Sequence, residues 1–275
     1  MNKPIVNKAN LSEINRFSKN LPQTTILSVS DYEWGEQIAK YIAEVANFDY
    51  EVVYPLKDDK INLDVGKIYV KQARELVQKT RTALKKNKVY IIYKASTMNE
   101  QAQNAFLKSL EEPNSSTFYI LLVNNVHSLL PTVLSRSQIL KITPLNNDAS
   151  LKLIPDNIPA NIKQQILFVA NGNPLLINKL VNDSSLISQY SAHITTAKSF
   201  LTASTYHKLI TINKLKDSRE DAIATLDALI KILSTTIKTP DKQLLALLNN
   251  ALNARNDLLS NLNVRLTLIH HLINF

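Results

Sequence analysis

The residues from Ser30 to Gln37 lie where a strand is expected to pass into a helix, a position at which many proteins bind nucleotide phosphates. A working phosphate loop, G-x-x-x-x-G-K-[ST], needs glycines for close backbone approach, a lysine for the β- and γ-phosphates and a hydroxyl for Mg²⁺. This stretch matches the pattern only at Gly35, because Ser30, Glu36 and Gln37 occupy the other positions. A carboxylate in place of the lysine reverses the charge that phosphate binding requires.

A second expected strand also ends without the side chains that ATP hydrolysis needs. An ATPase of this kind has an Asp-Glu pair after the strand, for metal binding and water activation, whereas this chain has Tyr93-Lys94 after Val89–Ile92. We therefore expect no ATP hydrolysis, no cofactor and no metal ion. Trp34 lies within the altered loop, and we hypothesise that it fills space that a nucleotide would otherwise take.

Composition narrows the possible chemistry further. The chain of 275 residues has no cysteine, which excludes disulfides, thiolate nucleophiles, cysteine-type zinc modules and iron–sulfur clusters. Its three glycines are too few for a glycine-rich nucleotide loop. The net charge of +9 suits a negatively charged partner, nucleic acid first, but is equally typical of a lysine-rich soluble surface.

Other pairs of reactive side chains carry little signal. Glu111 and Glu112 are consecutive on an expected helix, so their side chains point about 100° apart and do not converge on one substrate. His270 and His271 are also adjacent, and adjacent helical positions rarely chelate a metal. The basic stretch from Lys71 to Lys88 could meet DNA, although a solvated helix face explains it better because no aromatic platform accompanies it.

The elements that would position these residues alternate between strands and helices up to about residue 145. Apolar runs predict strands at 25–29, 52–54, 89–93 and 118–123, with an edge strand at 139–142. Helical patterns fall at 35–46, 70–86 and 98–112, the last capped by Thr97 with Glu100 and ended by Pro113. Apolar runs without polar alternation are typical of a parallel sheet that is covered on both faces.

Strand signals fade after residue 147. Ser218 opens a helix with an apolar stripe, Pro240 restarts the pattern, and a last helix follows. These three helices are predicted from their apolar stripes: Ile223, Leu226, Ile230, Leu233 and Ile237; Leu244, Leu248 and Leu252; Leu262, Leu266, Ile269 and Ile273. The predicted domains are residues 1–145, 146–185 and 186–275. No apolar run is long enough to cross a membrane and no signal peptide is evident, so a cytoplasmic protein is expected.

Four segments in one order along the chain carry a family resemblance. Residues 68–77 resemble I-x-V-x-Q-I-R-E-L, and residues 98–113 resemble M-x-x-x-A-x-N-A-L-L-K-x-L-E-E-P. Residues 131–137 are similar to P-x-I-x-S-R-C, and residues 261–266 to N-x-N-x-R-L. Together they resemble the bacterial clamp-loader AAA+ subunits, densely over 66–145 and sparsely elsewhere. The resemblance implies an α/β AAA+ domain with a RecA-like parallel sheet, a small helical lid module and an all-α C-terminal collar.

Within this family, the loss of both nucleotide motifs resembles the delta-prime branch of the DNA polymerase III clamp loader. The zinc-binding cysteines of many relatives are absent, and Ser137 stands at the motif cysteine. Asn124 and Asn125 occupy the first sensor region, and the stretch 172–175 lacks the arginine of the second. The implied partners are the gamma/tau ATPase subunits and the delta subunit, with the sliding clamp and primer–template DNA reached through the complex.

The resemblance also gives Arg136, between Ser135 and Ser137, a role as an arginine finger on the γ-phosphate bound by a neighbouring subunit. A guanidinium suits this work because it is permanently charged and its fork matches phosphate oxygens. The alternative is a surface arginine paired with a local carboxylate. Two other functions stay open: an ATPase with an unusual site, and a stand-alone basic adaptor that binds nucleic acid.

Overall fold

The computed structural model describes residues 3–63, 65–80, 86–111, 114–236, 241–260 and 262–273. The chain forms two compact units, Met1–Asn178 and Lys179–Phe275. Several positions used in the sequence predictions lie outside the described residues: 81–85, Glu112, Pro113, Ile237, Pro240 and Asn261.

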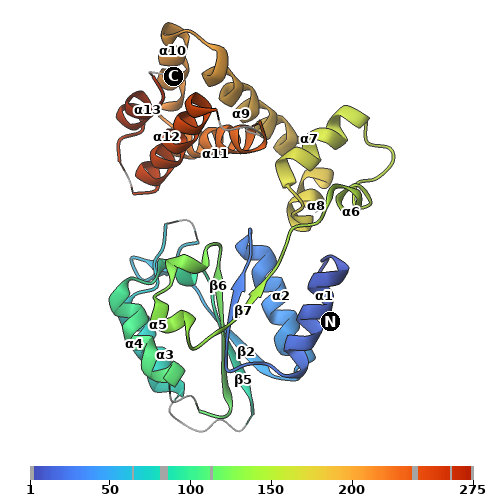
Figure 1. The fold of residues 1–275 in the computed structure, drawn as a ribbon, viewed down its shortest axis with the longest axis vertical. Coiled ribbons are helices and arrows are strands. Elements are labelled where there is room, and N and C mark those ends of the chain that lie inside the picture. Colours follow the sequence, from blue (N-terminus) through green and yellow to red (C-terminus); the bar gives the residue numbers. More distant parts are fainter. Residues whose placement is uncertain are drawn as a thin grey trace. The chain divides into compact units, whose positions relative to one another are not determined.

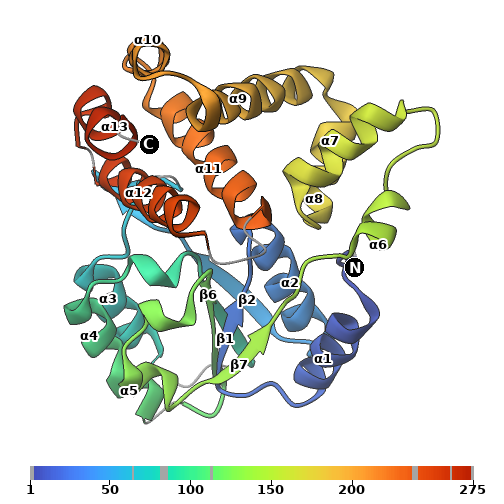
Figure 2. The ribbon, with the colours of Figure 1, turned by 45° about the horizontal axis from the view of Figure 1, so that its top comes forward.

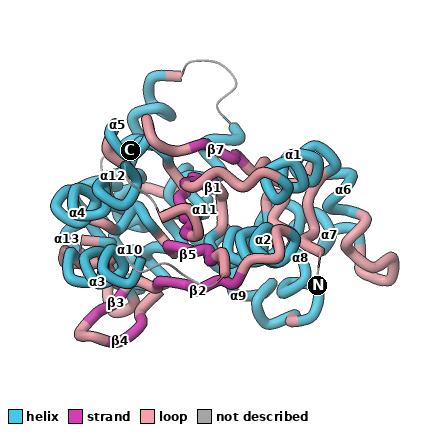
Figure 3. Tube along the Cα trace, turned by 90° about the horizontal axis from the view of Figure 1, so that it is seen from below, coloured by secondary structure: helices cyan, strands magenta, loops and turns pink. Residues whose placement is uncertain are grey.

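The first unit is built on a five-stranded parallel sheet with the order β2-β5-β6-β1-β7. Figure 3 shows the strands between two layers of helix. The strands are β1 (Thr24–Ser28), β2 (Asp49–Val53), β5 (Lys88–Ile92), β6 (Thr117–Val123) and β7 (Gln138–Lys141). The predicted strands and the edge position of the last one are confirmed. A short antiparallel hairpin, β3 (Leu56–Lys57) with β4 (Lys60–Ile61), was not predicted.

Helices cover both faces of the sheet (Figures 1 and 2). One face packs against α1 (Lys8–Lys19) and α2 (Tyr32–Val45). The other packs against α3 (Val70–Thr80), α4 (Glu100–Glu111) and α5 (Pro131–Leu134). Side chains of β1 alternate between the two cores, since Ile26 faces one and Leu27 the other. The predicted doubly covered sheet is therefore confirmed, whereas α1 was not predicted.

The start of α4 differs from the prediction. Residues 95–97 form a separate 3₁₀ turn, η1 (Ala95–Thr97), in which the Thr97 hydroxyl donates to the carbonyl of Lys94 at 2.8 Å. The cap is Asn99, whose Oδ1 accepts a hydrogen bond from the backbone N of Ala102 at 2.9 Å. Met98 has an extended backbone, so the helix cannot begin at Thr97, and the predicted capping box is wrong.

Three short helices follow the sheet: α6 (Asn147–Leu151), α7 (Ala160–Ala170) and α8 (Pro174–Asn182). Gly172 joins α7 to α8 with φ +77°, and its carbonyl accepts a hydrogen bond from the N of Leu145 at 2.9 Å. A Cβ at this position would lie 2.2 Å from the carbonyl oxygen of Leu145, so the close approach requires glycine. The boundary between the compact units falls within α8, and the predicted domain limits at 145 and 185 stay a prediction.

The second unit is entirely helical in its described residues. It contains α9 (Ser184–Thr202), α10 (Thr205–Leu215), α11 (Arg219–Thr236), α12 (Lys242–Leu259) and α13 (Val264–Leu272). Ser218 caps α11 through a hydrogen bond from the N of Asp221 to its Oγ at 3.2 Å, which agrees with the predicted start. No helix within the described residues is long and apolar enough to span a lipid bilayer.

The apolar stripes predicted for the last two helices are confirmed only in part. The partly buried residues that pack against the helical core include Leu244, Leu248, Ile269 and Ile273. In α12 the buried positions are Leu247, Ala251, Ala254 and Leu258. The predicted Leu252, Leu262 and Leu266 are 39%, 51% and 67% exposed. Ala251 and Ala254 are completely buried, because small side chains let neighbouring helices approach closely.

Candidate functional site: the phosphate-loop position and the Arg136 turn

The phosphate-loop residues lie at the carboxyl end of β1 and the first turn of α2. A helix N-terminus attracts anions because its first backbone N–H groups lack partners within the helix. Here Asp31 is the cap, and its Oδ1 accepts a hydrogen bond from the N of Trp34 at 2.8 Å. The chain's own carboxylate thus occupies the end of the helix that would face a phosphate. Ser30 is exposed beside it.

Gly35 serves packing in this turn. Its N–H donates to the carbonyl of Asp31 at 3.0 Å, as in an ordinary helix. A Cβ at this position would lie only 2.7 Å from Cγ2 of the buried Val29, so the glycine lets α2 lie close to the end of β1.

Glu36 is held by Lys40 on its own helix and by Tyr54, which follows β2. Its Oε1 accepts a hydrogen bond from the Tyr54 hydroxyl at 2.6 Å and forms an ion pair with Lys40 Nζ at 2.7 Å. The carboxylate stands at the position of the phosphate-loop lysine and is mostly covered, with 13% of its side chain exposed. Gln37, at the magnesium-ligand position, points outward and is exposed.

Three tyrosines, Tyr32, Tyr54 and Tyr93, form a cluster beside Glu36. The Tyr93 ring centroid lies 5.6 Å from that of Tyr32 and 5.4 Å from that of Tyr54. The Tyr32 hydroxyl shares a 3.0 Å hydrogen bond with Ser96 Oγ. Burial, the hydrogen bond to Glu36 and its negative charge raise the pKa of Tyr54 to about 12. Burial and the charge of Glu36 raise the pKa of Tyr93 to about 12 as well, so both phenols stay protonated and neutral at neutral pH.

Lys94 follows Tyr93 with a left-handed backbone, φ 51°. Its ammonium donates a hydrogen bond to the carbonyl of Leu63 and lies 5.5 Å from the centroid of the Tyr32 ring. The structure therefore brings the altered residues of both motifs together at one edge of the sheet. It places a cation and an aromatic ring where the acidic pair of an ATPase is expected.

Trp34, in the first turn of α2, is completely buried, and its indole Nε1 donates to the carbonyl of Ile5 at 3.2 Å. It packs in the core shared by α1 and α2. That position explains its burial by packing alone, and the hypothesis that it replaces a nucleotide stays a prediction.

The sensor-region residues satisfy local backbone groups. The N of Asn124 donates to the Tyr32 hydroxyl at 3.3 Å, so it belongs to the tyrosine cluster. Asn125 caps η2 (Val126–Ser128) by accepting from the N of His127 at 2.9 Å. Asn173 accepts in the same way from the N of Leu175 at 3.0 Å at the start of α8.

Arg136 lies in the turn between α5 and β7. Its Nη1 donates to the carbonyl of Thr132 and to Ser135 Oγ, both at 3.1 Å. Its Nη2 forms an ion pair with Glu111 Oε1 at 3.0 Å. Ser137 donates from Oγ to the carbonyl of Val133 at 2.8 Å, which fixes the turn. The pairing with a local carboxylate that the alternative prediction described is therefore present in the isolated chain.

Arg136 and the phosphate-loop position lie at opposite ends of neighbouring parallel strands. Arg136 comes just before the amino end of β7, whereas Ser30 follows the carboxyl end of β1, and Thr25 of β1 is aligned with Gln138 of β7. Five strand residues span about 16 Å. The fold thus separates the guanidinium from the phosphate-loop position of its own chain.

Sequence reasoning missed three participants. Asp31 precedes an apolar-periodic stretch, which is the ordinary signal for a cap and could have been found. Tyr54 lies 18 positions from Glu36, and no local signal connects them. Glu111 pairs with Arg136, 25 positions away, and no local signal connects these two residues either.

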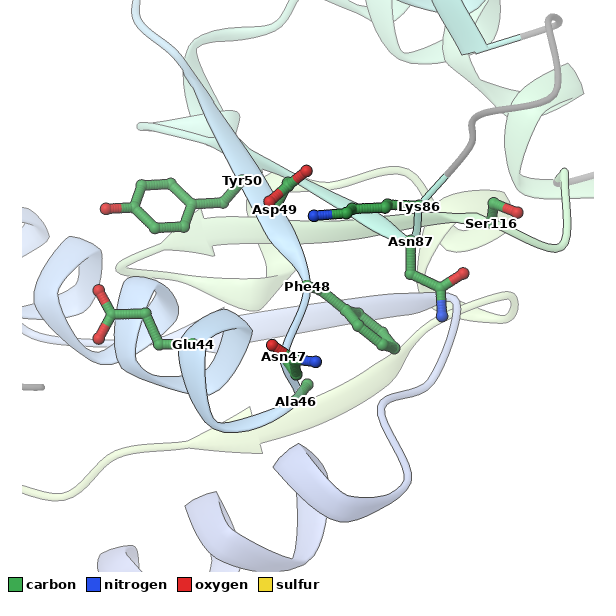
Figure 4. A pocket seen from close by; sticks show the side chains of 9 residues that line it. All are labelled: Glu44, Ala46, Asn47, Phe48, Asp49, Tyr50, Lys86, Asn87 and Ser116. Carbon is green, nitrogen blue, oxygen red and sulfur yellow. The ribbon is translucent and has the colours of Figure 1, made fainter.

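A separate hollow lies at the amino ends of β2 and β5, with a volume of about 1110 Å³ (Figure 4). Polar and charged side chains dominate its lining, including Glu44, Asp49 and Lys86. Lys86 and Asn87, from the basic stretch that the sequence analysis considered for DNA contact, also line it. The hollow lies at the opposite end of the sheet from the tyrosine cluster.

Comparison with known proteins bears on the identity of the first unit. The family model described as DNA polymerase III, delta subunit matches residues 15–146. The DNA polymerase III subunit delta′ of Pseudomonas aeruginosa is 35% identical over 139 residues, and that of Haemophilus influenzae is 28% identical over 130 residues. Residues 15–146 are thus similar to the delta′ subunits of DNA polymerase III, which supports the predicted resemblance.

The delta-prime likeness covers part of each protein. The two alignments include 48% and 46% of this chain and 40% and 38% of the relatives, so the chain matches about two-fifths of their length. The subunit delta′ of Bacillus subtilis is 38% identical over 87 residues, which is 32% of this chain and 26% of that protein.

Solved structures resemble the chain beyond the delta-prime segment. A DNA polymerase III gamma subunit-related protein of Thermotoga maritima has a TM-score of 0.61 at 17% identity, covering 96% of this chain and 97% of that one. The RuvB Holliday junction branch migration motor of the same organism has a TM-score of 0.51 at 15% identity, covering 96% and 87%. At this identity the likeness concerns the fold alone, and it confirms the predicted AAA+ domain followed by a helical C-terminal region.

Proposed function

We propose that this chain is a non-hydrolysing subunit of the DNA polymerase III clamp loader that presents Arg136 to a triphosphate bound by a neighbouring subunit. Its partners are the gamma/tau ATPase subunits and the delta subunit. ATP binding by the ATPase partner would then drive opening of the sliding clamp at primer–template DNA.

The observation that carries the non-hydrolysing role is the filled phosphate-loop position. Asp31 caps α2, and Glu36 lies between Tyr54 and Lys40. A triphosphate at this place would meet two carboxylates, and the phosphate-loop lysine that would offset its charge is absent. Binding therefore would require the helix cap and the Glu36 hydrogen bond to break.

The position of Arg136 supports action on another subunit. The fold separates it from its own phosphate-loop position, and its side chain is 37% exposed at the surface. In related nucleotide hydrolases an arginine finger contributes on the order of 10³–10⁵ to the rate. Because Arg136 lies away from the phosphate-loop position of its own chain, it would act as a finger on a triphosphate bound by a neighbouring subunit.

The test is Arg136→Ala in a reconstituted clamp loader with its native partners. We expect the complex to assemble normally and its DNA-stimulated ATPase to fall, because hydrolysis at the one site served by this chain is lost. The matched control is Arg16→Ala, which removes an exposed arginine that is paired with Glu13 on α1. Normal ATPase from the Arg136→Ala complex would remove the finger role.

The net charge of +9 favours a second candidate, a basic adaptor that binds nucleic acid without neighbours. Tight, salt-sensitive DNA binding by the monomer, with no affinity for the gamma and delta subunits, would support it.

A further inference from the structure

The guanidinium of Arg136 is already engaged within its own chain. Both hydrogens of Nη1 have acceptors, in the Thr132 carbonyl and Ser135 Oγ, while Nη2 contacts the carboxylate of Glu111. Glu111 is the last residue of α4 and lies 25 positions before Arg136, so the side chain of Arg136 is held both by its own turn and by a separate helix. An arginine in this arrangement is folded back on its own turn.

A carboxylate and a phosphate oxygen compete for the same donors. Both accept the planar fork of a guanidinium at similar distances. To contact a phosphate through Nη2, Arg136 must give up Glu111 or share it, because Oε1 lies 3.0 Å from that nitrogen.

We propose that Glu111 is a positioning residue that holds Arg136 in a resting orientation until a neighbour's triphosphate displaces it. This inference rests on the proposed function. Glu111 thereby limits hydrolysis in complexes whose neighbouring site is not fully closed.

The strength of the contact suits such a role. The side chains of Arg136 and Glu111 are 37% and 49% exposed, and an exposed pair of this kind changes an equilibrium by a factor of about five at most. A multiply charged triphosphate with its metal can overcome that factor. The pair is therefore strong enough to bias the side chain and too weak to lock it.

Glu111→Gln tests the inference in the reconstituted complex. The variant keeps the shape of the side chain and removes its charge. It also removes a carboxylate from the C-terminal end of a helix, where negative charge is unfavourable, so the fold is not threatened. We expect the ATPase kcat without clamp and DNA to rise about two- to five-fold. The KM for ATP should fall by no more than the same factor, because the triphosphate no longer has to displace a carboxylate from Arg136.

Three comparisons sharpen the result. Glu111→Asp keeps the charge and should stay nearer the unmodified rate than Glu111→Gln. Glu13→Gln breaks another exposed Glu–Arg pair in the same unit and should leave the rate unchanged. Raising the salt concentration should shrink the difference between Glu111→Gln and the unmodified complex, because salt screens exposed pairs.

The double variant Arg136→Ala/Glu111→Gln separates the two ideas. If Glu111 acts through Arg136, the double variant behaves as Arg136→Ala alone. If Arg136→Ala lowers the ATPase and Glu111→Gln leaves it unchanged or lowers it, the inference fails and the proposed function stands. If Arg136→Ala has no effect, the proposed function itself fails.

Discussion

At the scale of single residues, the altered phosphate-loop position is stabilised by contacts between its own substitutions. Glu36 would be an isolated and mostly covered carboxylate without Tyr54 and Lys40, and such a group costs free energy unless it is paired and hydrogen-bonded. The tyrosine cluster supplies the hydroxyl and the covering rings. The residues that replace the lysine and the acidic pair thus depend on one another.

The Tyr54 hydroxyl provides the first test at this scale. Tyr54→Phe keeps the ring and removes the donor to Glu36, so we expect the free energy of unfolding to fall by about 1–2 kcal/mol. Urea denaturation measures the change. Tyr69→Phe, at a position that is 48% exposed, is the control and should change stability by less than about 0.5 kcal/mol. An equal effect in both variants would contradict a specific role for the bond to Glu36.

The raised pKa values predict how stability depends on alkaline pH. The pKa of both Tyr54 and Tyr93 is about 12 in the folded chain, above the ordinary phenol value of 10.0. Between these values the unfolded chain releases its phenol protons first, so ionisation favours unfolding. The contribution of these phenols is complete below pH 10 and is lost as the pH rises to 12. As the pH rises across this range, the denaturation midpoint should fall less steeply for Tyr93→Phe than for the unmodified chain. Identical slopes for the two proteins would contradict the prediction.

At the scale of elements, the junction between β1 and α2 is determined by packing and capping. Asp31 caps the helix, and Gly35 lets it lie against Val29. In a phosphate loop these positions would serve the ligand. Here they connect the helix tightly to the sheet.

Gly35→Ala tests this packing. An alanine in a helix usually gains about 1 kcal/mol over glycine. At this site the new Cβ would lie 2.7 Å from Val29 Cγ2, in a core where overpacking costs about 1–3 kcal/mol. We expect thermal denaturation to show that Gly35→Ala lowers the stability of the chain. In a chain that already carries Val29→Ala, adding Gly35→Ala should cause a smaller loss. A gain in stability from Gly35→Ala alone would show that the contact relaxes freely.

At the scale of the whole molecule, the chain combines an AAA+ unit with a separate helical unit, each with its own core. The +9 charge belongs to the complete chain and does not decide between a subunit and an adaptor. The filled phosphate-loop position does bear on whether the isolated chain can act as an ATPase.

Isothermal titration of the isolated chain with ATP and Mg²⁺ checks this. We expect no measurable binding, because Asp31 and Glu36 oppose the triphosphate and the chain offers no phosphate-loop lysine. The gamma ATPase subunit serves as the positive control. If the unmodified chain gives a saturable binding heat, and the Glu36→Lys variant gives the same heat, an unusual ATPase site would be favoured.

The sequence by itself determined the parallel sheet, the covering helices α2, α3 and α4, and the mismatch to the phosphate-loop pattern. These depend on apolar runs, periodicity and residue types at fixed local spacing. Tertiary structure decided the partners of Glu36, the pairing of Arg136 with Glu111 and the buried faces of α12 and α13. Such contacts join side chains that are distant in sequence, and they depend on how helices and strands pack against one another. A local pattern carries no record of that packing.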